Sequence, residues 1–163
     1  MTLVKVLFVC LGNICRSPMA EAIFQDMVSE KGFDDFVVVD SAGTGDYHVG
    51  EPPHDGTIQK LNEVGINANG LVGRQVTEED FVHFDYIITM DDDNMDAIKD
   101  LIPSDTDLIV KKLLDYLPEK QVHNVPDPYF TGDFDETYEL IHEACQHLFN
   151  EVKIKIEMKQ EEY

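Results

Sequence analysis

Hydrophobic and polar positions follow two different rhythms along the chain, and these predict strands and helices in turn. Residues 3–10 form an apolar run that is rich in β-branched residues and has one charged interruption. That pattern is typical of a strand buried on both faces of a parallel sheet. Shorter runs of the same kind predict further strands at residues 36–40, 86–90 and 107–111.

Helices are predicted between these strands from periodicity and from residues that start or stop a helix. Ser17 and Pro18 are of the types preferred at a helix cap and at the first helical position. A helix is therefore expected to begin there and to stop at Gly32. Further helical segments are expected at residues 55–64, 77–80 and 91–101.

The last predicted helix has the clearest periodic signal. Asp133 is a cap residue, and apolar residues then recur every three or four positions at Phe134, Tyr138, Ile141, Cys145, Leu148, Val152 and Ile156. This spacing gives one apolar helix face, which we expect to pack on the sheet. Strands that alternate with helices predict an α/β fold with a parallel sheet and helices on both faces. Ligands of such sheets bind beyond the carboxyl ends of the strands.

Length and charge narrow the possible classes of function. A chain of 163 residues can form one domain with its own core, and we expect that domain at residues 1–158, followed by a frayed tail at residues 159–163. The 12 basic and 33 acidic residues give a net charge of −21, which repels nucleic-acid phosphates and anionic lipid headgroups. No apolar run approaches the roughly 20 residues that span a bilayer. We therefore expect no nucleic-acid partner and no membrane association.

The three cysteines do not form a disulfide framework, because their number is odd and Cys10 and Cys15 are only five residues apart. Free thiols fit a reducing compartment, so a cytoplasmic location is expected. Cys145 lies on the apolar face of the last predicted helix and is expected to be a core residue. Cys10 ends a buried strand and is the candidate for chemistry.

The segment after the first strand has the composition of an anion-binding loop. It consists of Cys10, Leu11, Gly12, Asn13, Ile14, Cys15, Arg16 and Ser17. A tight turn before a helix points backbone N–H groups inward, and such groups bind anions. The loop lacks the Lys-Ser/Thr pair of a nucleotide-binding P-loop and the three spaced glycines of a dinucleotide site. A thiol at its start and a guanidinium at its end are the pair needed for phosphoryl transfer through cysteine.

Each polar residue of this loop has a physical task. The helix N-terminus, the converging amides and Arg16 favour a thiolate at Cys10. The planar guanidinium of Arg16 can hold two phosphate oxygens at once, and the chain has one other arginine, Arg74. Ser17 can cap the helix or hydrogen-bond the thiolate, and both alternatives stay open. Asn13 tolerates a left-handed backbone and can hold the loop with its side chain.

Transfer to cysteine also needs a general acid for the leaving oxygen. Asp127 is the candidate, because it stands between two prolines that stiffen the backbone around its carboxyl group. Two aromatic residues follow, Tyr129 and Phe130, and they could line a slot for a ring. With 33 acidic residues in the chain, position alone does not single out Asp127.

These residues resemble the low-molecular-weight protein tyrosine phosphatase family, in its bacterial form, over nearly the whole chain. Residues 10–17 fit that family's C-x-x-x-x-x-R-S loop, and residues 18–21 fit the helix after it. Residues 41–44 fit the segment after the second strand, and residues 127–129 fit the acid loop. The loop motif is shared with unrelated phosphatases. Its place near the amino terminus, with a distant Asp-Pro-aromatic triplet, is peculiar to this family.

The resemblance implies a role for each of these residues. Cys10 would be the nucleophile, Arg16 the clamp of the transition state, and Asp127 the general acid and later the base that activates water. Ser41 would help Asn13 to hold the loop in shape. The resemblance also implies a flavodoxin-like, four-stranded parallel sheet in the order 2-1-3-4, with no metal and no organic cofactor. Phosphate and other oxyanions are expected to inhibit by binding in the loop.

The same resemblance also implies the class of substrate. In this family a Thr at the position of Ile14 goes with phosphoarginine, whereas a larger aliphatic residue goes with phosphotyrosine. Ile14 therefore favours phosphotyrosine proteins or peptides. The ring would lie between Tyr129 and the Tyr47–His48 stretch, where bacterial relatives often carry Trp, and Phe130 would complete the pocket.

Cys15 has two open roles. In the resembling family the neighbouring loop thiol can form a reversible disulfide with the nucleophile, which would protect Cys10 from irreversible oxidation. The alternative is that Cys15 only fills space. Recovery of activity by thiol after mild peroxide treatment, compared with Cys15→Ala, separates the two.

Three other functions compete with tyrosine phosphatase activity. A protein arginine phosphatase of the same fold is the nearest. An arsenate reductase would need further cysteines near the centre of the chain, and none lies between Cys15 and Cys145. A non-catalytic phosphopeptide-binding module would keep the anion loop without turnover. The presence of Cys10, Arg16 and Asp127 together argues against such a module.

Overall fold

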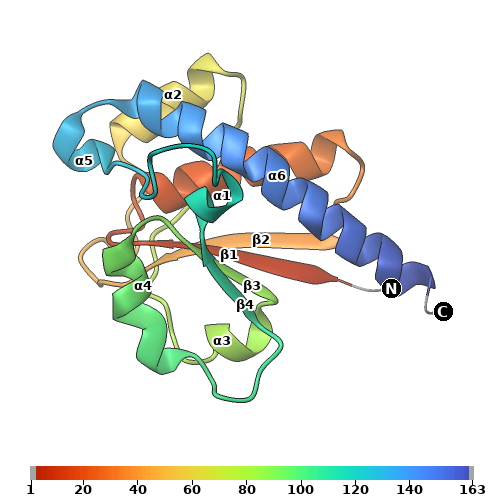
Figure 1. Cartoon of the computed structure of the whole chain (residues 1–163). Coiled ribbons are helices and arrows are strands. Elements are labelled where there is room, and N and C mark those ends of the chain that lie inside the picture. Colours follow the sequence, from red (N-terminus) through yellow and green to blue (C-terminus); the bar gives the residue numbers. More distant parts are fainter. Residues whose placement is uncertain (1–2, 162–163) are drawn as a thin grey trace.

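The computed structural model describes residues 3–161 and has a four-stranded parallel sheet at its centre (Figure 1). The strands are β1 (Val4–Cys10), β2 (Val37–Gly43), β3 (Tyr86–Thr89) and β4 (Ile109–Lys112). They lie in the order β2-β1-β3-β4, and every neighbouring pair is parallel. The predicted sheet and its strand order are therefore confirmed.

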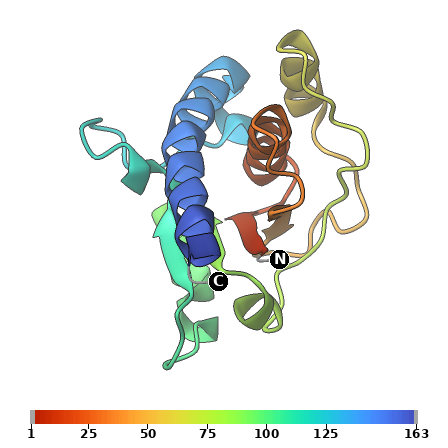
Figure 2. The ribbon, with the colours of Figure 1, turned by 90° about the vertical axis from the view of Figure 1, so that its right-hand side faces the viewer.

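Helices cover both faces of this sheet (Figures 1 and 2). One face carries α1 (Arg16–Glu30), α2 (Asp55–Glu63) and α6 (Phe134–Glu161). The other face carries α3 (Asp80–His83), α4 (Asp92–Ile98) and the 3-10 turn η1 (Lys99–Leu101). Two short elements, η2 (Leu113–Tyr116) and α5 (Pro128–Thr131), connect β4 to α6. No helix within residues 3–161 is long and apolar enough to cross a membrane.

The side chains of β1 alternate between the two layers of the core. Val6 and Phe8 belong to the large cluster under α1 and α6, whereas Leu7 and Val9 belong to the smaller cluster under α3 and α4. All four are fully buried. Because both faces are covered, the strand is apolar at nearly every position, as the sequence indicates.

Aromatic contacts hold α1 against the sheet and against α6. Phe24 of α1 packs edge to face on Phe8 of β1 with a ring-centroid distance of 5.6 Å, and on Phe149 of α6 at 6.2 Å. Such pairs contribute about 0.5–1.5 kcal/mol beyond the area that they bury. These contacts fix the position of the helix whose N-terminus carries the candidate anion loop.

Two element boundaries near that loop differ from the prediction. β2 continues to Gly43 instead of ending at residue 40, because it pairs with β1 up to Cys10. The first helix begins at Arg16, one residue before the predicted cap at Ser17. Both changes extend regular structure up to the edge of the loop.

The carboxyl-terminal helix begins as predicted and extends further. Asp133 Oδ1 accepts the backbone N–H of Glu136 at 2.9 Å, which confirms the predicted cap. α6 continues through Glu161, so the predicted domain boundary at residue 158 falls inside the helix. The predicted tail is helical at residues 159–161, and residues 162–163 lie outside the described part of the chain.

Candidate active site

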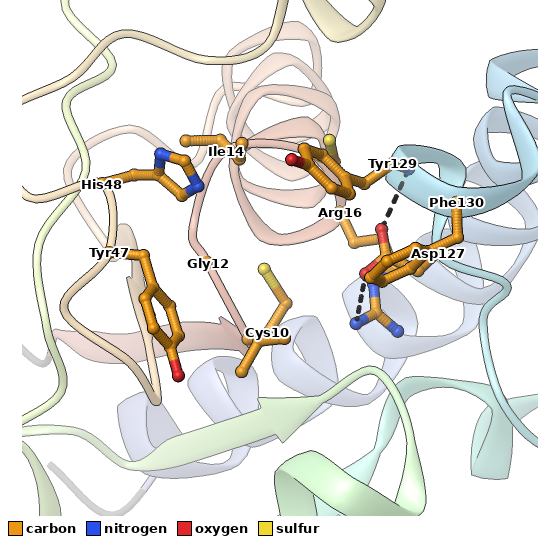
Figure 3. Close-up of a pocket in the computed structure, with 11 residues that line it drawn as sticks. Cys10, Gly12, Ile14, Arg16, Tyr47, His48, Asp127, Tyr129 and Phe130 are labelled. Carbon is orange, nitrogen blue, oxygen red and sulfur yellow. Dashed lines mark hydrogen bonds and ion pairs between the residues drawn. The ribbon is translucent and has the colours of Figure 1, made fainter.

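The loop between β1 and α1 borders a cavity of about 270 Å³ (Figure 3). Cys10 is the last residue of β1 and Arg16 the first of α1, so the candidate loop lies where the sequence places it. The cavity is lined by Cys10, Leu11, Gly12, Ile14, Cys15, Arg16, Tyr47, His48, Asp127, Tyr129 and Phe130. Three segments that are distant in the sequence therefore meet at the carboxyl edge of the sheet.

The Cys10 sulfur is held by two hydrogen-bonding groups of its own loop. The backbone N–H of Asn13 donates to it at 3.3 Å, and the Ser17 hydroxyl lies 3.0 Å away. Ser17 Oγ already accepts a hydrogen bond from Asn13 Nδ2 at 2.7 Å, so its own hydrogen is available to the sulfur. Two donors directed at one sulfur suit the negative charge of a thiolate.

Asn13 joins the loop to two neighbouring segments. Its backbone is left-handed, with φ of 56°, a conformation that Asn tolerates better than most residues. Its Nδ2 donates to Ser17 Oγ and also to Ser41 Oγ at 2.9 Å. Its Oδ1 accepts the backbone N–H of Arg74 at 3.0 Å. The three residues predicted to support the loop, Asn13, Ser17 and Ser41, are therefore connected by hydrogen bonds.

The same network reaches Glu21, a residue that the sequence reasoning did not identify. Ser41 accepts from Asn13, and its hydroxyl donates to Glu21 Oε1 at 2.6 Å. Burial raises the pKa of the Glu21 carboxyl to about 7, and Asp40 adds to the rise, whereas the Ser41 hydrogen bond and Arg74 oppose it. Glu21 therefore changes charge near neutral pH. Only the packing of α1 on β2 exposes this partnership, so no local sequence signal could have shown it.

Ser17 does not cap the helix. Cys15 occupies the cap position, and its side chain makes no capping hydrogen bond. Arg16 and Ser17 are the first two helical residues, and Pro18 follows within the first turn, where its missing N–H would have had no helical partner. Of the two roles left open for Ser17, the structure therefore has the hydrogen bond to Cys10.

The Arg16 side chain is buried and is held by acceptors on one side. Its Nη1 donates to Asp91 Oδ2 at 2.7 Å and to the Val125 carbonyl at 2.9 Å, and its Nη2 lies 3.4 Å from Asp127 Oδ2. Its Nε is buried and has no hydrogen-bond partner among the described residues. Leaving a buried donor unpaired costs about 1–3 kcal/mol. This N–H is therefore suited to an anion in the cavity.

Asp91 is a site residue that the sequence reasoning missed. It caps α4 by accepting the backbone N–H of Asn94 at 2.8 Å, while the Asn94 side chain accepts the backbone N–H of Asp91 at 3.2 Å. Its second oxygen binds Arg16. A signal was present, because Asp91 follows β3, whose carboxyl end lies at the same edge of the sheet as that of β1.

Asp127 lies at the start of α5, a short helix that was not predicted. Its Oδ1 accepts the backbone N–H of Tyr129 at 3.1 Å, and Pro128 takes the first helical position. Gly132 ends the helix with a left-handed φ of 74°. The other carboxylate oxygen faces Arg16, and the side chain is 21% exposed. Asp127 is therefore fixed at the cavity edge and stays accessible to water.

The predicted pocket residues surround the entrance of the cavity (Figure 3). Tyr47 lies on one side of Cys10, and Tyr129 and Phe130 lie on the other. Their exposed fractions are 72%, 56% and 76%, whereas Ile14 is buried in the loop. Tyr129 and Phe130 pack edge to face with ring centroids 5.2 Å apart. The cavity therefore combines a polar base with an aromatic entrance.

Two histidines complete the surroundings of the loop. His48 lines the cavity, and Gly12 leaves room for its ring, because a Cβ at Gly12 would lie 3.2 Å from His48 Cδ2. His54, which the sequence reasoning did not identify, packs between two aromatic rings. Its ring centroid lies 6.2 Å from that of Tyr129 and 5.3 Å from that of Phe134. Its backbone N–H also donates to the Ile14 carbonyl at 2.8 Å, so this segment links the anion loop to the acid segment.

The second thiol of the loop, Cys15, also lines the cavity. Burial raises the pKa of Cys15 to about 12, and the charges of Asp127 and Cys10 add to the rise. Cys15 is therefore protonated at neutral pH and does not compete as a nucleophile. Cys145 is fully buried in the core, as predicted, and burial raises the pKa of its thiol as well.

Comparison with known proteins places this chain among a set of phosphatases. The profile of the family named low molecular weight phosphotyrosine protein phosphatase matches residues 5–159. The low molecular weight protein-tyrosine-phosphatase YfkJ of Bacillus subtilis is 46% identical over 93% of this chain and 97% of that protein. PtpA of Staphylococcus epidermidis is 42% identical over 91% of this chain and 93% of that protein.

Solved structures agree with the sequence relatives. The crystal structure of YfkJ has a TM-score of 0.91 and 44% identity, and the match covers 95% of this chain and 98% of that chain. The crystal structure of a Drosophila arginine phosphatase has a TM-score of 0.85 and 35% identity, over 92% and 98% of the two chains. The fold, the loop between β1 and α1, and the extent of these matches agree with one another. The chain therefore belongs to the low molecular weight phosphotyrosine protein phosphatase family.

Proposed function

We propose that this protein hydrolyses phosphotyrosine in proteins or peptides through a cysteinyl-phosphate intermediate. One observation carries the proposal: Cys10 and Arg16 line the same cavity. The Cys10 sulfur is held by two hydrogen-bond donors, and the buried Nε of Arg16 has no partner among the described residues. A nucleophile and a fixed anion-binding group in one cavity are what phosphoryl transfer requires. Family membership agrees with this assignment.

In the first step the Cys10 thiolate attacks phosphorus. The S–P bond forms as the bond between phosphorus and the tyrosine oxygen breaks, and Asp127 gives its proton to that oxygen. Arg16 and the backbone N–H groups of the loop stabilise the charge on the equatorial oxygens. Because these groups are already in position, little reorganisation accompanies the reaction.

In the second step a water molecule attacks the phosphorus of the intermediate. Asp127, now a carboxylate, accepts a proton from that water, the S–P bond breaks, and the Cys10 thiolate and phosphate are released. The 21% exposure of the Asp127 side chain leaves it open to water. Phosphate and related oxyanions bind in the same loop and act as inhibitors.

The entrance supports a phenyl ring as the group that carries the phosphate. Tyr47 and Tyr129 stand on either side of the cavity, and Ile14 gives an apolar contact within the loop. An aromatic ring between such walls gains about 0.5–1.5 kcal/mol per aromatic contact beyond buried area. The three free thiols, Cys10, Cys15 and Cys145, support a cytoplasmic location.

The test is phosphate release from matched phosphotyrosine, phosphoserine and phosphoarginine peptides, with chelator present, by the parent protein and by Cys10→Ser. We expect turnover of phosphotyrosine only, abolished by the substitution. Saturable phosphopeptide binding without phosphate release would contradict an enzymatic function and would favour a binding module.

A protein arginine phosphatase is the second candidate, because a solved arginine phosphatase shares 35% identity and the fold with this chain. We expect the side chain at position 14 to distinguish the two activities. If phosphoarginine is preferred over phosphotyrosine in the same assay, the chemistry stands and the substrate assignment is wrong. Ile14→Thr is expected to move the preference toward phosphoarginine.

A further inference from the structure

The entrance of the cavity has an apolar rim, formed by Leu11, Tyr47, Tyr129 and Phe130. All four residues line the cavity and are also exposed, with Leu11 at 42% and Phe130 at 76%. Figure 3 shows Tyr47 and Phe130 on opposite sides of Cys10. A single phenyl ring cannot cover all of these surfaces. The rim therefore offers apolar contacts to the residues that flank a phosphotyrosine.

Exposed acidic residues lie in the segments that follow the strands at this edge of the sheet. Asp46 directly precedes Tyr47, Asp133 follows α5, and Asp93 lies at the start of α4, and all three are exposed. Among the residues that line the cavity, Arg16 is the one Lys or Arg, and it is buried. The net charge of the whole chain is −21. The field outside the cavity is therefore negative, although the base of the cavity binds anions.

Basic side chains close to this edge are already paired. Lys112, at the carboxyl end of β4, lies 2.9 Å from Asp92. Arg74, next to the segment that supports the loop, lies 3.0 Å from Asp80 and 3.1 Å from Asp40. Neither is available to attract an acidic segment of a substrate.

We propose that this entrance selects phosphotyrosines flanked by apolar and basic residues and rejects those flanked by Asp and Glu, an inference that rests on the proposed function. Apolar neighbours bury surface against the rim. Basic neighbours are attracted by the surrounding carboxylates, and acidic ones are repelled. The phosphate itself still binds, because Arg16 and the loop N–H groups act on it at hydrogen-bond distance.

The test measures kcat/KM for phosphotyrosine peptides of one length with three kinds of flank: Leu and Lys, Gly and Ser, or Asp and Glu. At low salt we expect kcat/KM for the Leu-Lys peptide to exceed that for the Asp-Glu peptide by about 10- to 100-fold, within the range of electrostatic effects on association. At about 0.5 M salt the part due to charge shrinks to a few-fold, since the screening length falls below about 5 Å. The apolar preference over Gly and Ser persists.

Variants separate the two contributions. The double change Asp46→Lys and Asp93→Lys should restore turnover of the acidic peptide and leave p-nitrophenyl phosphate turnover unchanged. Phe130→Ala should lower the ratio between apolar and Gly-Ser flanks, because it removes the most exposed side chain of the rim. Val82→Ala is the matched control, since Val82 is 78% exposed on α3, at the opposite edge of the sheet, and should keep that ratio.

The outcomes distinguish this inference from the proposed function. Turnover of p-nitrophenyl phosphate with equal kcat/KM for the three peptides would overturn the selectivity and leave the phosphatase activity intact. Faster turnover of the acidic peptide would also overturn it. If p-nitrophenyl phosphate itself is not hydrolysed, the proposed function fails and the selectivity fails with it.

Discussion

Two segments build the site, and they are held in place by different means. The phosphate loop, residues 10–17, is almost entirely buried and is fixed by hydrogen bonds that converge on Asn13. The acid loop, residues 127–129, and Phe130 after it are held by one helix cap, by the contact of Asp127 with Arg16 and by edge-to-face packing, and their rings are exposed. Groups that stabilise charge must be rigid before the substrate arrives, whereas groups that recognise a side chain need open surface.

The largest effect should come from the phosphate loop. Arg16→Lys keeps the positive charge but removes the planar fork that can grip two phosphate oxygens. We expect kcat/KM for phosphotyrosine to fall by about 10²- to 10³-fold, as for other lost donors of an anion-binding site. Steady-state kinetics check this, with the unfolding temperature as a control for folding. A loss of less than tenfold would mean that charge alone suffices.

A change in the acid loop should be smaller and should depend on the leaving group. Asp127→Asn removes the proton donor, so turnover of phosphotyrosine is expected to fall by about 10²-fold. The p-nitrophenolate released from p-nitrophenyl phosphate leaves easily as an anion without a proton. Turnover of that substrate should therefore fall much less. Equal losses for both substrates would contradict the role of Asp127 as the acid.

The hydrogen bonds of the phosphate loop should also contribute to stability. Asn13→Gly keeps the left-handed backbone possible but leaves the Arg74 N–H without its acceptor and Ser17 and Ser41 without their donor. We expect about 1–3 kcal/mol less free energy of unfolding in a denaturant titration, together with lower activity. An unchanged unfolding midpoint would show that the loop does not depend on this amide.

The smallest effect concerns the dependence of stability on pH. Burial raises the pKa of Glu21 from 4.5 to about 7, so the folded state binds its proton more tightly than the unfolded state. The contribution of this tighter proton binding to the free energy of unfolding is complete below about pH 4.5 and is lost as the pH rises through 7. Glu21→Gln cannot titrate, so the stability of the parent relative to this variant should decline between pH 4.5 and 7. A constant difference over that range would contradict the shifted pKa.

The comparison of the two loops also explains what the sequence could reveal. The apolar run before Cys10 and the alternation of strands and helices predict the sheet, because burial on both faces favours apolar residues at nearly every position of a strand. The same argument places the phosphate loop at the carboxyl edge. Asp127 required the resemblance to a family, since nothing in its local pattern separates it from other acidic residues.

The two Xaa-Pro helix starts show the limit of local signals. The local pattern of Ser17-Pro18 predicts a cap, but the helix begins earlier and Ser17 hydrogen-bonds the Cys10 sulfur. Asp127-Pro128 forms a cap followed by proline at the first helical position, where the local pattern predicts a loop. Tertiary contacts decide between these outcomes. Asp91 and Glu21 were missed for the same reason, because their partners come from other elements.

The central claim is that the phosphoryl group passes through Cys10, and product partitioning tests it most directly. Several aryl phosphates with different leaving groups are hydrolysed in the presence of glycerol, and the ratio of glycerol phosphate to inorganic phosphate is measured. A common cysteinyl-phosphate predicts one ratio for all substrates and neither product with Cys10→Ser. A ratio that changes with the leaving group, or turnover that survives in Cys10→Ser, would contradict the account.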